Sequence, residues 1–432
     1  MAAPAADTNT KKGFFTYENG ILVLLGFTFG LIFFDRNAVG VLTPFILDDL
    51  QLSASQLGML SSMLALAWAI SAYVFAAMSD RKGARKPFIL GSILVFSACS
   101  ALSGLAGSFG FLLLARIVMG VAEGPFLPIC LSVMNRESSP HRRGMNAGIM
   151  QNVFAALLGT TLAPLVLTAL AQQFDWRVTF FLTGIPGLIC AFLVWKFMKE
   201  PNNTDKGPFA EQTASQESGS SVEPSPGSDH IEFSALGMLK EHNIRVCALI
   251  AICLVSWFLV TLTFIFLFLP TMRGLTPGET GAVTSAMGIS TMLGGFLVPG
   301  LSDRIGRKPV MIVFTFIGMV TPLTALFFDG PLWLMGVLFF IGWSATGSFP
   351  LFMGVVPGET VNPKLAASSM GLVVCIGELV GGFASPWLAG IMADATSLNA
   401  PMYFCLVCAF LSGIAALFLK ETAPSKTGAT AA

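Results

Sequence analysis

The chain has 432 residues, of which 54% are hydrophobic and only 11% are charged, and its formal net charge is zero. A soluble domain carries about 25% charged residues, so this composition excludes an ordinary soluble protein and indicates a chain that lies mostly in lipid. No basic cluster with interleaved aromatic residues offers a surface to nucleic acid, and we expect no nucleic-acid partner.

Twelve stretches are apolar and long enough to cross a bilayer as helices, because a hydrocarbon core of about 30 Å needs about 20 apolar residues. Lipid leaves only helices or closed barrels able to satisfy their backbone polar groups. The sequence therefore predicts an all-α membrane protein with twelve transmembrane helices. They are expected at 20–46, 57–78, 87–107, 110–134, 145–171, 178–198, 245–270, 281–302, 309–328, 331–356, 365–391 and 401–420.

A polar stretch rich in Ser, Pro and Gly separates the sixth and seventh predicted helices. We expect a cytosolic tail at 1–19, a six-helix bundle at 20–198, a cytosolic linker at 199–244, a second six-helix bundle at 245–420 and a cytosolic tail at 421–432. Lys and Arg are concentrated in the loops on the side of both tails. The positive-inside rule therefore predicts a multi-pass protein of the inner (plasma) membrane with both termini in the cytosol.

A charged signature occurs twice at equivalent helix ends. The loop after the second predicted helix runs from Asp80 to Pro87, the loop after the eighth runs from Asp303 to Pro309, and both share Asp, Arg, Gly, Arg, Lys and Pro in that order. The repeat indicates two homologous six-helix halves. The pattern resembles the signature of the major facilitator superfamily over essentially the whole chain, although Ala76 and Pro299 stand where that signature commonly begins with glycine. The resemblance implies two pseudo-symmetric six-helix bundles around a central site.

The same signature supplies candidates for a conformational switch. An aspartate at a helix end can pair with an arginine and with the N-terminus of a neighbouring helix, which would brace the outward-facing state until the bundles rock. The candidates are Asp80, Arg81, Arg85, Asp303, Arg304 and Arg307.

Five ionisable side chains fall inside predicted helices: Asp35, Arg36, Arg116, Glu123 and Glu378. Each costs at least about 2.5–3.5 kcal/mol on insertion scales, so each is expected to have a partner or a function. Asp35 and Arg116 lie at similar depths and are level enough to form an ion pair. Arg116 and Glu123 are seven residues apart and therefore share one helix face, which we expect to line a central cavity.

These charges suit proton coupling. Burial in a low-dielectric cavity generally raises the pKa of a carboxyl group and a nearby arginine lowers it, so movement of the arginine switches proton affinity. Arg36, about 100° round the helix from Asp35, can present planar donors to an anion. A purely structural network of Asp35, Arg36, Arg116 and Glu123 is the alternative. For Glu378, a structural hydrogen bond and a proton-binding or substrate-orienting role both remain open.

The segments around these charges are distinctive: Asp35 to Asn37, Arg116 to Pro128, Arg143 to Gly144, and Trp176 to Arg177. Together they resemble the anion:cation symporter branch, which includes carriers of sugar acids and other carboxylates. The resemblance implies that the aspartate of the first helix and the glutamate of the fourth, Asp35 and Glu123, are proton sites. It further implies that Arg36 serves the anion and that Arg116 links charge state to conformation.

Softer substrate-binding candidates are amides, aromatic rings and a hydroxyl, for which packing between helices is the alternative. The branch often has Asn where Cys130 stands and Tyr where Trp68 stands, and both differences bear on the substrate. The candidates are Trp68, Tyr73, Gln151, Asn152, Trp343 and Ser344.

We therefore predict a proton-coupled symporter that takes up a small organic anion, either a simple carboxylate, an aromatic acid or a sugar acid, by alternating access. A proton-driven exporter of drugs or metabolites is the alternative. His141, His230 and His242 lie in loops without a metal or nucleophile motif, so we expect no enzyme, no cofactor and no metal. The eight cysteines are expected to pack in the core. The expected partners are the anion, protons and bilayer lipid, and the protein is expected to be a monomer.

Overall fold

A computed structural model describes residues 16–139, 142–200, 235–361, 365–423 and 426. Twelve helical segments in this part of the chain are long and apolar enough to cross a membrane, and these residues contain no strand. Each segment begins and ends within four residues of its predicted bounds. The prediction of an all-α fold with twelve transmembrane helices is therefore confirmed.

Single helices form seven of the spans: α1 (Tyr17–Leu50), α2 (Ala54–Lys82), α3 (Lys86–Ser103), α8 (Trp176–Phe197), α11 (His242–Arg273), α12 (Pro277–Ile305) and α19 (Ala400–Leu417). The fourth and ninth spans each consist of two helices: α4 (Phe109–Glu123) with α5 (Phe126–Glu137), and α13 (Arg307–Ile317) with α14 (Val320–Phe327).

The three remaining spans contain π- or 3₁₀-helical turns. The fifth comprises α6 (Arg143–Gly148), η2 (Ile149–Val153), η3 (Ala155–Leu162) and α7 (Ala163–Phe174). The tenth comprises α15 (Leu332–Trp343), η4 (Ser344–Ser348), η5 (Leu351–Val355) and α16 (Val356–Thr360). The eleventh comprises α17 (Ala366–Ile376), η7 (Gly377–Ala384) and α18 (Ser385–Ala395), and a short helix α10 (Ala235–Met238) precedes the seventh span.

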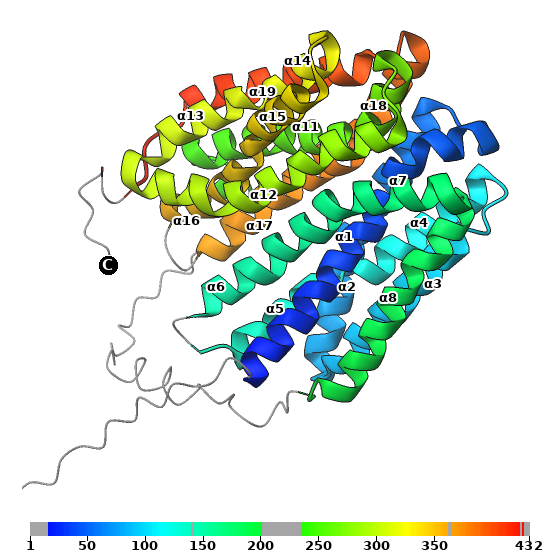
Figure 1. Cartoon of the computed structure of the whole chain (residues 1–432). Coiled ribbons are helices and arrows are strands. Elements are labelled where there is room, and N and C mark those ends of the chain that lie inside the picture. The colour runs from blue at the N-terminus through cyan, green and yellow to red at the C-terminus, as the bar shows by residue number, and fades with distance from the viewer. Residues whose placement is uncertain (1–15, 140–141, 201–234, 362–364, 424–425, 427–432) are drawn as a thin grey trace, which may run out of the picture.

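The first six spans, blue to green, lie beside the last six, green to red (Figure 1). We call the face with the helix ends at Tyr17, Phe197 and Leu417 the linker face, and the opposite face, with Leu50 and Ala54, the far face. Contacts between the halves pair α2 with α18, α12 with η3 and α7, and α1 with α11. The expected linker lies mostly outside the described residues, so its bounds stay a prediction.

Glycines fix the distance between α2 and α4. A Cβ atom built on Gly120 would lie 2.5 Å from the carbonyl oxygen of Leu64, and one on Gly124 would lie 2.0 Å from Ser71 Oγ. Only glycine permits this approach. Pro125 lacks a backbone N–H, so it interrupts the span directly after Gly124. The fourth span therefore packs closely against α2 at the point where α4 ends.

π-Helical turns recur in the fifth and eleventh spans, which occupy equivalent positions in the two halves. They are η2 and η3 in the fifth span and η7 in the eleventh. A π turn is rare and often marks a functional site. These turns contain three of the predicted site residues: Gln151, Asn152 and Glu378.

A carboxylate of the second half caps a helix of the first half at the far face. Asp394, near the end of α18, accepts hydrogen bonds from the backbone N–H groups of Ala54 (2.8 Å) and Ser55 (2.9 Å) at the start of α2. A Cβ atom on Gly390 would lie 2.4 Å from the Ala54 carbonyl oxygen. The two helices therefore meet backbone to backbone at this face.

Two further hydrogen bonds join the halves closer to the centre of the membrane. The Trp387 backbone N–H donates to Ser62 Oγ at 3.1 Å, and Thr263 Oγ1 donates to Ser61 Oγ at 3.1 Å. Together with Asp394, these contacts close the far face.

At the linker face, two glutamates play equivalent parts in the two halves. Glu200, just beyond α8, accepts hydrogen bonds from the Arg85 and Lys86 backbone N–H groups at the start of α3, at 2.5 and 3.0 Å. Glu421, just beyond α19, accepts from the first two N–H groups of α13 at 2.8 and 3.1 Å. Each glutamate thus ties its own half together, and the repeat extends beyond the Asp-Arg signature.

Candidate functional site

Asp35 lies on α1 and is buried, with 2% of its surface exposed. Its Oδ1 accepts a hydrogen bond from Ser100 Oγ on α3 at 3.0 Å, and Ser100 Oγ lies 2.7 Å from Thr183 Oγ1 on α8. Oδ2 has no hydrogen-bond partner among the described residues. The sequence prediction missed Ser100 and Thr183, whose only signal is a small hydroxyl in an apolar helix.

Arg116 lies on α4 and is 1% exposed. Its Nη1 donates to the Asp35 backbone carbonyl at 3.2 Å, and its Cζ lies 5.8 Å from the centre of the Phe180 ring. The predicted ion pair between Asp35 and Arg116 therefore does not form. Arg116 instead donates a hydrogen bond to the Asp35 main chain, and the Asp35 carboxylate accepts one from Ser100. Nε and Nη2 of Arg116 have no hydrogen-bond partner among the described residues.

Glu123 is the last residue of α4 and is 1% exposed. Neither carboxylate oxygen has a hydrogen-bond partner in the described part of the chain. The charged groups that act on it are Arg36, Asp35 and Arg116. The structure thus brings the four charges of the first half within electrostatic reach of one another.

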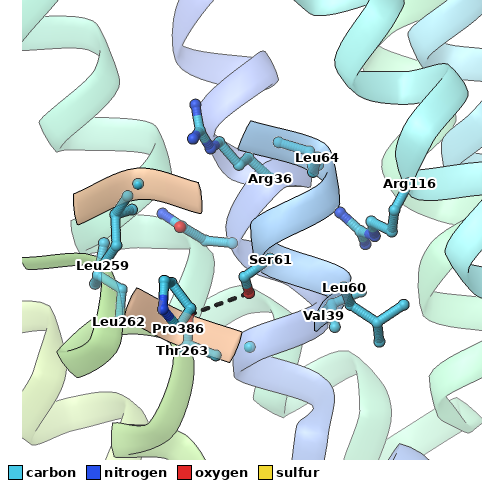
Figure 2. Close-up of a pocket in the computed structure, with 13 residues that line it drawn as sticks. Arg36, Val39, Leu60, Ser61, Leu64, Arg116, Leu259, Leu262, Thr263 and Pro386 are labelled. Atoms are coloured by element: carbon cyan, nitrogen blue, oxygen red, sulfur yellow. Dashed lines mark hydrogen bonds between the residues drawn. The ribbon is translucent and has the colours of Figure 1, made fainter. Parts of the chain in front are cut away.

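Arg36 lines a cavity between the two halves. Its Cζ lies 5.8 Å from the Phe33 ring centre and 5.7 Å from that of Trp68, both within cation–π range. Figure 2 shows Arg36 pointing away from Arg116, with Leu64 of α2 between them. The first half contributes Arg36, Asn37, Val39, Gly40, Leu60, Ser61, Leu64 and Arg116, and the second contributes Leu259, Leu262, Thr263, Gly382 and Pro386.

The cavity offers about 40 Å³ to the centres of water molecules. One water needs about 10–15 Å³ on this measure, so the space holds a few waters and is too small for an organic acid. Binding of a larger solute therefore requires the halves to move apart beside Arg36.

Glu378 belongs to the second half and lies on η7, half-buried. Its Oε2 lies 2.6 Å from the position that a Cβ atom on Gly382 would occupy, and Gly382 lines the cavity. Arg36 is the charged group that acts on the Glu378 carboxylate. Among the described residues of the second half, Glu378 is the only acidic residue inside a predicted transmembrane helix.

The remaining substrate-binding candidates fall in two groups. Trp343 is fully buried in the second half, where Nε1 donates to Thr291 Oγ1 at 2.9 Å and the ring lies 4.7 Å from that of Trp257. Ser344 Oγ donates to the Ile341 carbonyl at 2.6 Å. These contacts place Trp343 and Ser344 in helix packing and not along the cavity.

The other candidates are more accessible. Tyr73 on α2 is 81% exposed, and Gln151 and Asn152 on η2 are also exposed. Trp68 is half-buried beside Arg36. The structure therefore brings only Trp68 of this group into contact with the charged cluster.

The switch candidates form similar contacts in the two halves. Arg307 pairs with Asp303 and with Glu359 (2.9 Å) and donates to Ser302 Oγ at 2.7 Å. Arg85 donates to Ser79 Oγ at 3.2 Å, which corresponds to the Ser302 contact. Arg81 and Arg304 are exposed, and the side chain of Asp80 lies outside what the structure describes.

Comparison with known proteins agrees with the fold. The profile of the Major Facilitator Superfamily matches residues 25–384 and 264–432. A hexuronate transporter of Bacillus subtilis (strain 168) is 35% identical over 187 residues, and the match spans 43% of this chain and 44% of that protein, less than half of its length. A 3-(3-hydroxy-phenyl)propionate transporter of Escherichia coli (strain K12) is 26% identical over 377 residues, which cover 86% of both chains.

A solved structure extends the likeness to the fold. The crystal structure of a bacterial homolog to the human lysosomal transporter Spinster, in an inward-facing and unoccupied conformation, has a TM-score of 0.71 at 19% identity, covering 94% of this chain and 98% of that chain. With its family profile matched over most of its length and twelve apolar helices in place, the chain belongs to the major facilitator superfamily and is a multi-pass membrane transporter, not an enzyme.

Proposed function

We propose that this transporter is a proton-coupled symporter that takes up a small organic anion by alternating access, in the inner (plasma) membrane and with both termini in the cytosol. The observation that carries the proposal is the position of Arg36, which lines a cavity between the halves, follows buried Asp35 in the chain and acts electrostatically on buried Glu123. The two relatives named above are described as carriers of a hexuronate and a substituted propionate, both carboxylates.

Arg36 is the proposed receptor for the anion. A guanidinium keeps its charge when buried, and its planar donors match a carboxylate. In the described part of the chain, Arg36 has no ion-pair partner within 4.0 Å, so its donors are available to a solute. The adjacent rings of Phe33 and Trp68 hold its orientation.

Asp35 and Glu123 are the proposed proton sites. The charges of Asp35, Arg36, Arg116 and Glu123 sum to zero when all four are ionised, Glu378 of the second half adds one negative charge, and an anion on Arg36 adds another. Net charge is costly in a low-dielectric interior, so binding of a monoanion favours uptake of one proton by the cluster. Arg116 touches the Asp35 backbone and acts electrostatically on Glu123, so a shift of α4 would change the environment of both acids.

Transport into vesicles containing the purified full-length protein tests this proposal. An acid exterior should drive accumulation of labelled carboxylates such as galacturonate or 3-hydroxybenzoate. Arg36→Ala should lose binding and transport, whereas Glu123→Gln should bind the anion and exchange it but no longer accumulate it against its gradient. Lys240→Ala and Glu241→Gln, both exposed at the linker face, are matched controls.

Two results would contradict the proposal. Wild-type accumulation by Glu123→Gln would remove that residue from the proton path. Proton-driven extrusion without uptake would instead favour an exporter.

A further inference from the structure

Glu378 lies on the cavity side of the eleventh span. It precedes Gly382 and Pro386 at intervals of four residues, and both of those residues line the cavity with Arg36. Residues at this spacing follow one face of a helix, so Glu378 continues the same face one turn closer to the linker face. An acidic group from the second half thus stands opposite the basic group from the first.

The Glu378 carboxylate has no polar partner among the described residues. In the described part of the chain it has no hydrogen bond and no ion pair within 4.0 Å, and its interaction with Arg36 across the interface is electrostatic. Glycine at position 382 leaves room for this arrangement, because a Cβ atom there would lie 2.6 Å from Oε2.

We propose that Glu378 selects the transported anion by charge: a monocarboxylate with a hydroxyl or N–H group at its other end is accepted, and a dicarboxylate is rejected. This inference rests on the function proposed above. Arg36 holds the single carboxylate from one half while Glu378 accepts a hydrogen bond from the far end of the solute. Substrate binding then bridges the two halves.

The physical basis is the interaction of like charges. A second carboxylate on the solute would face Glu378 where water is scarce, and two like charges several ångströms apart in such a site repel strongly. A hydroxyl in the same place donates to the Glu378 oxygen and satisfies a polar group that has no other partner. We expect discrimination of at least tenfold, which corresponds to about 1.4 kcal/mol.

Equilibrium binding to the purified full-length protein in lipid nanodiscs tests the inference with two matched pairs. One pair is 3-hydroxybenzoate with isophthalate, and the other is galactonate with galactarate. In the wild type, the monocarboxylate of at least one pair should bind at least tenfold more tightly than its dicarboxylate. Glu378→Gln should reduce the ratio to about threefold or less, and Glu378→Asp, which keeps the charge, should preserve it.

Leu379→Ala, at an exposed neighbouring position, is the control for general perturbation of the span, and it should leave the ratio unchanged. Equal wild-type affinity within both pairs, or an unaltered ratio in Glu378→Gln, overturns the role of Glu378. If Arg36→Ala abolishes binding in that case, the proposed function survives. If Arg36→Ala binds every probe like the wild type, the proposed function itself fails. Wild-type binding of neither monocarboxylate overturns the substrate class.

Discussion

The far and linker faces are held together in different ways. At the far face, Asp394 binds the start of α2 across the boundary between the halves. At the linker face, Glu200 and Glu421 each bind the start of a helix in their own half. The same chemistry, a carboxylate on backbone N–H groups, thus closes the interface at one face and stiffens a single half at the other. In the proposed alternating access, the contacts between the halves would have to break, whereas the contacts within one half would persist.

The exposed polar residues support this distinction. Tyr73, Gln151 and Asn152 are exposed on the part of α2 and of the fifth span that lies toward the linker face. At the far face, by contrast, α2 and α18 are held together by Asp394 and by the close approach at Gly390.

Gly390→Leu should have the largest effect. Its Cβ would lie 2.4 Å from the Ala54 carbonyl oxygen, so any side chain there prevents α18 from meeting α2. The far face could not close, and we expect uptake into vesicles to fall by up to about a hundredfold, since overpacking typically costs about 1–3 kcal/mol. Gly336→Leu is the matched control, because no atom lies within 4 Å of a Cβ there. Normal uptake by Gly390→Leu would show that the far face does not need this contact.

Asp394→Ala should weaken closure without preventing it. Loss of a side-chain cap typically costs about 0.5–2 kcal/mol, which shifts the equilibrium toward a far-open form by about two- to thirtyfold. Distance distributions between spin labels on α2 and α18 would report the shift, and Asp394→Asn, which keeps an acceptor, should give a smaller one. If the α2–α18 distances were unchanged in Asp394→Ala, the residue would only cap α2 and would not contribute to closure of the far face.

Glu421→Ala should act on stability and not on the conformational equilibrium. Burial raises the pKa of the Glu421 carboxyl, but hydrogen bonds from four backbone N–H groups outweigh it and hold the pKa below its ordinary value of 4.5. A lowered pKa in the folded state stabilises the fold above that ordinary value, and the stabilisation disappears as the pH falls through the folded-state pKa.

The variant should therefore lose about 1 kcal/mol of stability at neutral pH. Its difference from the wild type should shrink below about pH 4. Thermal unfolding at several pH values checks both statements, and Glu200→Ala tests the equivalent cap of the first half. A change in the α2–α18 spin-label distances would contradict the separation of the two faces.

Thr263→Val should have the smallest effect. The substitution keeps the shape and removes the hydrogen bond to Ser61, for which about 0.5–1 kcal/mol is typical. We expect a two- to fivefold shift toward the far-open form in the same distance measurement. A shift as large as that of Asp394→Ala would mean that the bond near the centre, and not the cap at the surface, controls closure.

Much of the fold follows from patterns that the sequence shows directly. Apolar length defines all twelve helices, and the Asp-Arg signature shows that the halves are related. Charges in apolar runs pointed to Asp35, Arg116 and Glu123, and the structure buries all three close together.

Side-chain direction is what the sequence could not supply. Equal depth made Asp35 and Arg116 plausible ion-pair partners, yet the carboxylate faces Ser100 and the guanidinium reaches the main chain. Trp343 was a candidate for the cavity because tryptophan can stack on a solute, but its ring packs on Trp257. No sequence pattern links Asp394 to the start of α2, because its partners lie about 340 positions earlier in the chain.

The glycine contacts between α2 and α4 have a mechanical consequence. Because α2 and α4 approach each other backbone to backbone at Gly120 and Gly124, we expect the two helices to move together. Ala54 at the start of α2 binds Asp394, and α4 carries Arg116 and Glu123. A tilt that separates Ala54 from Asp394 would therefore also displace Arg116 and Glu123. Opening of the far face and movement of the charge cluster would then occur together.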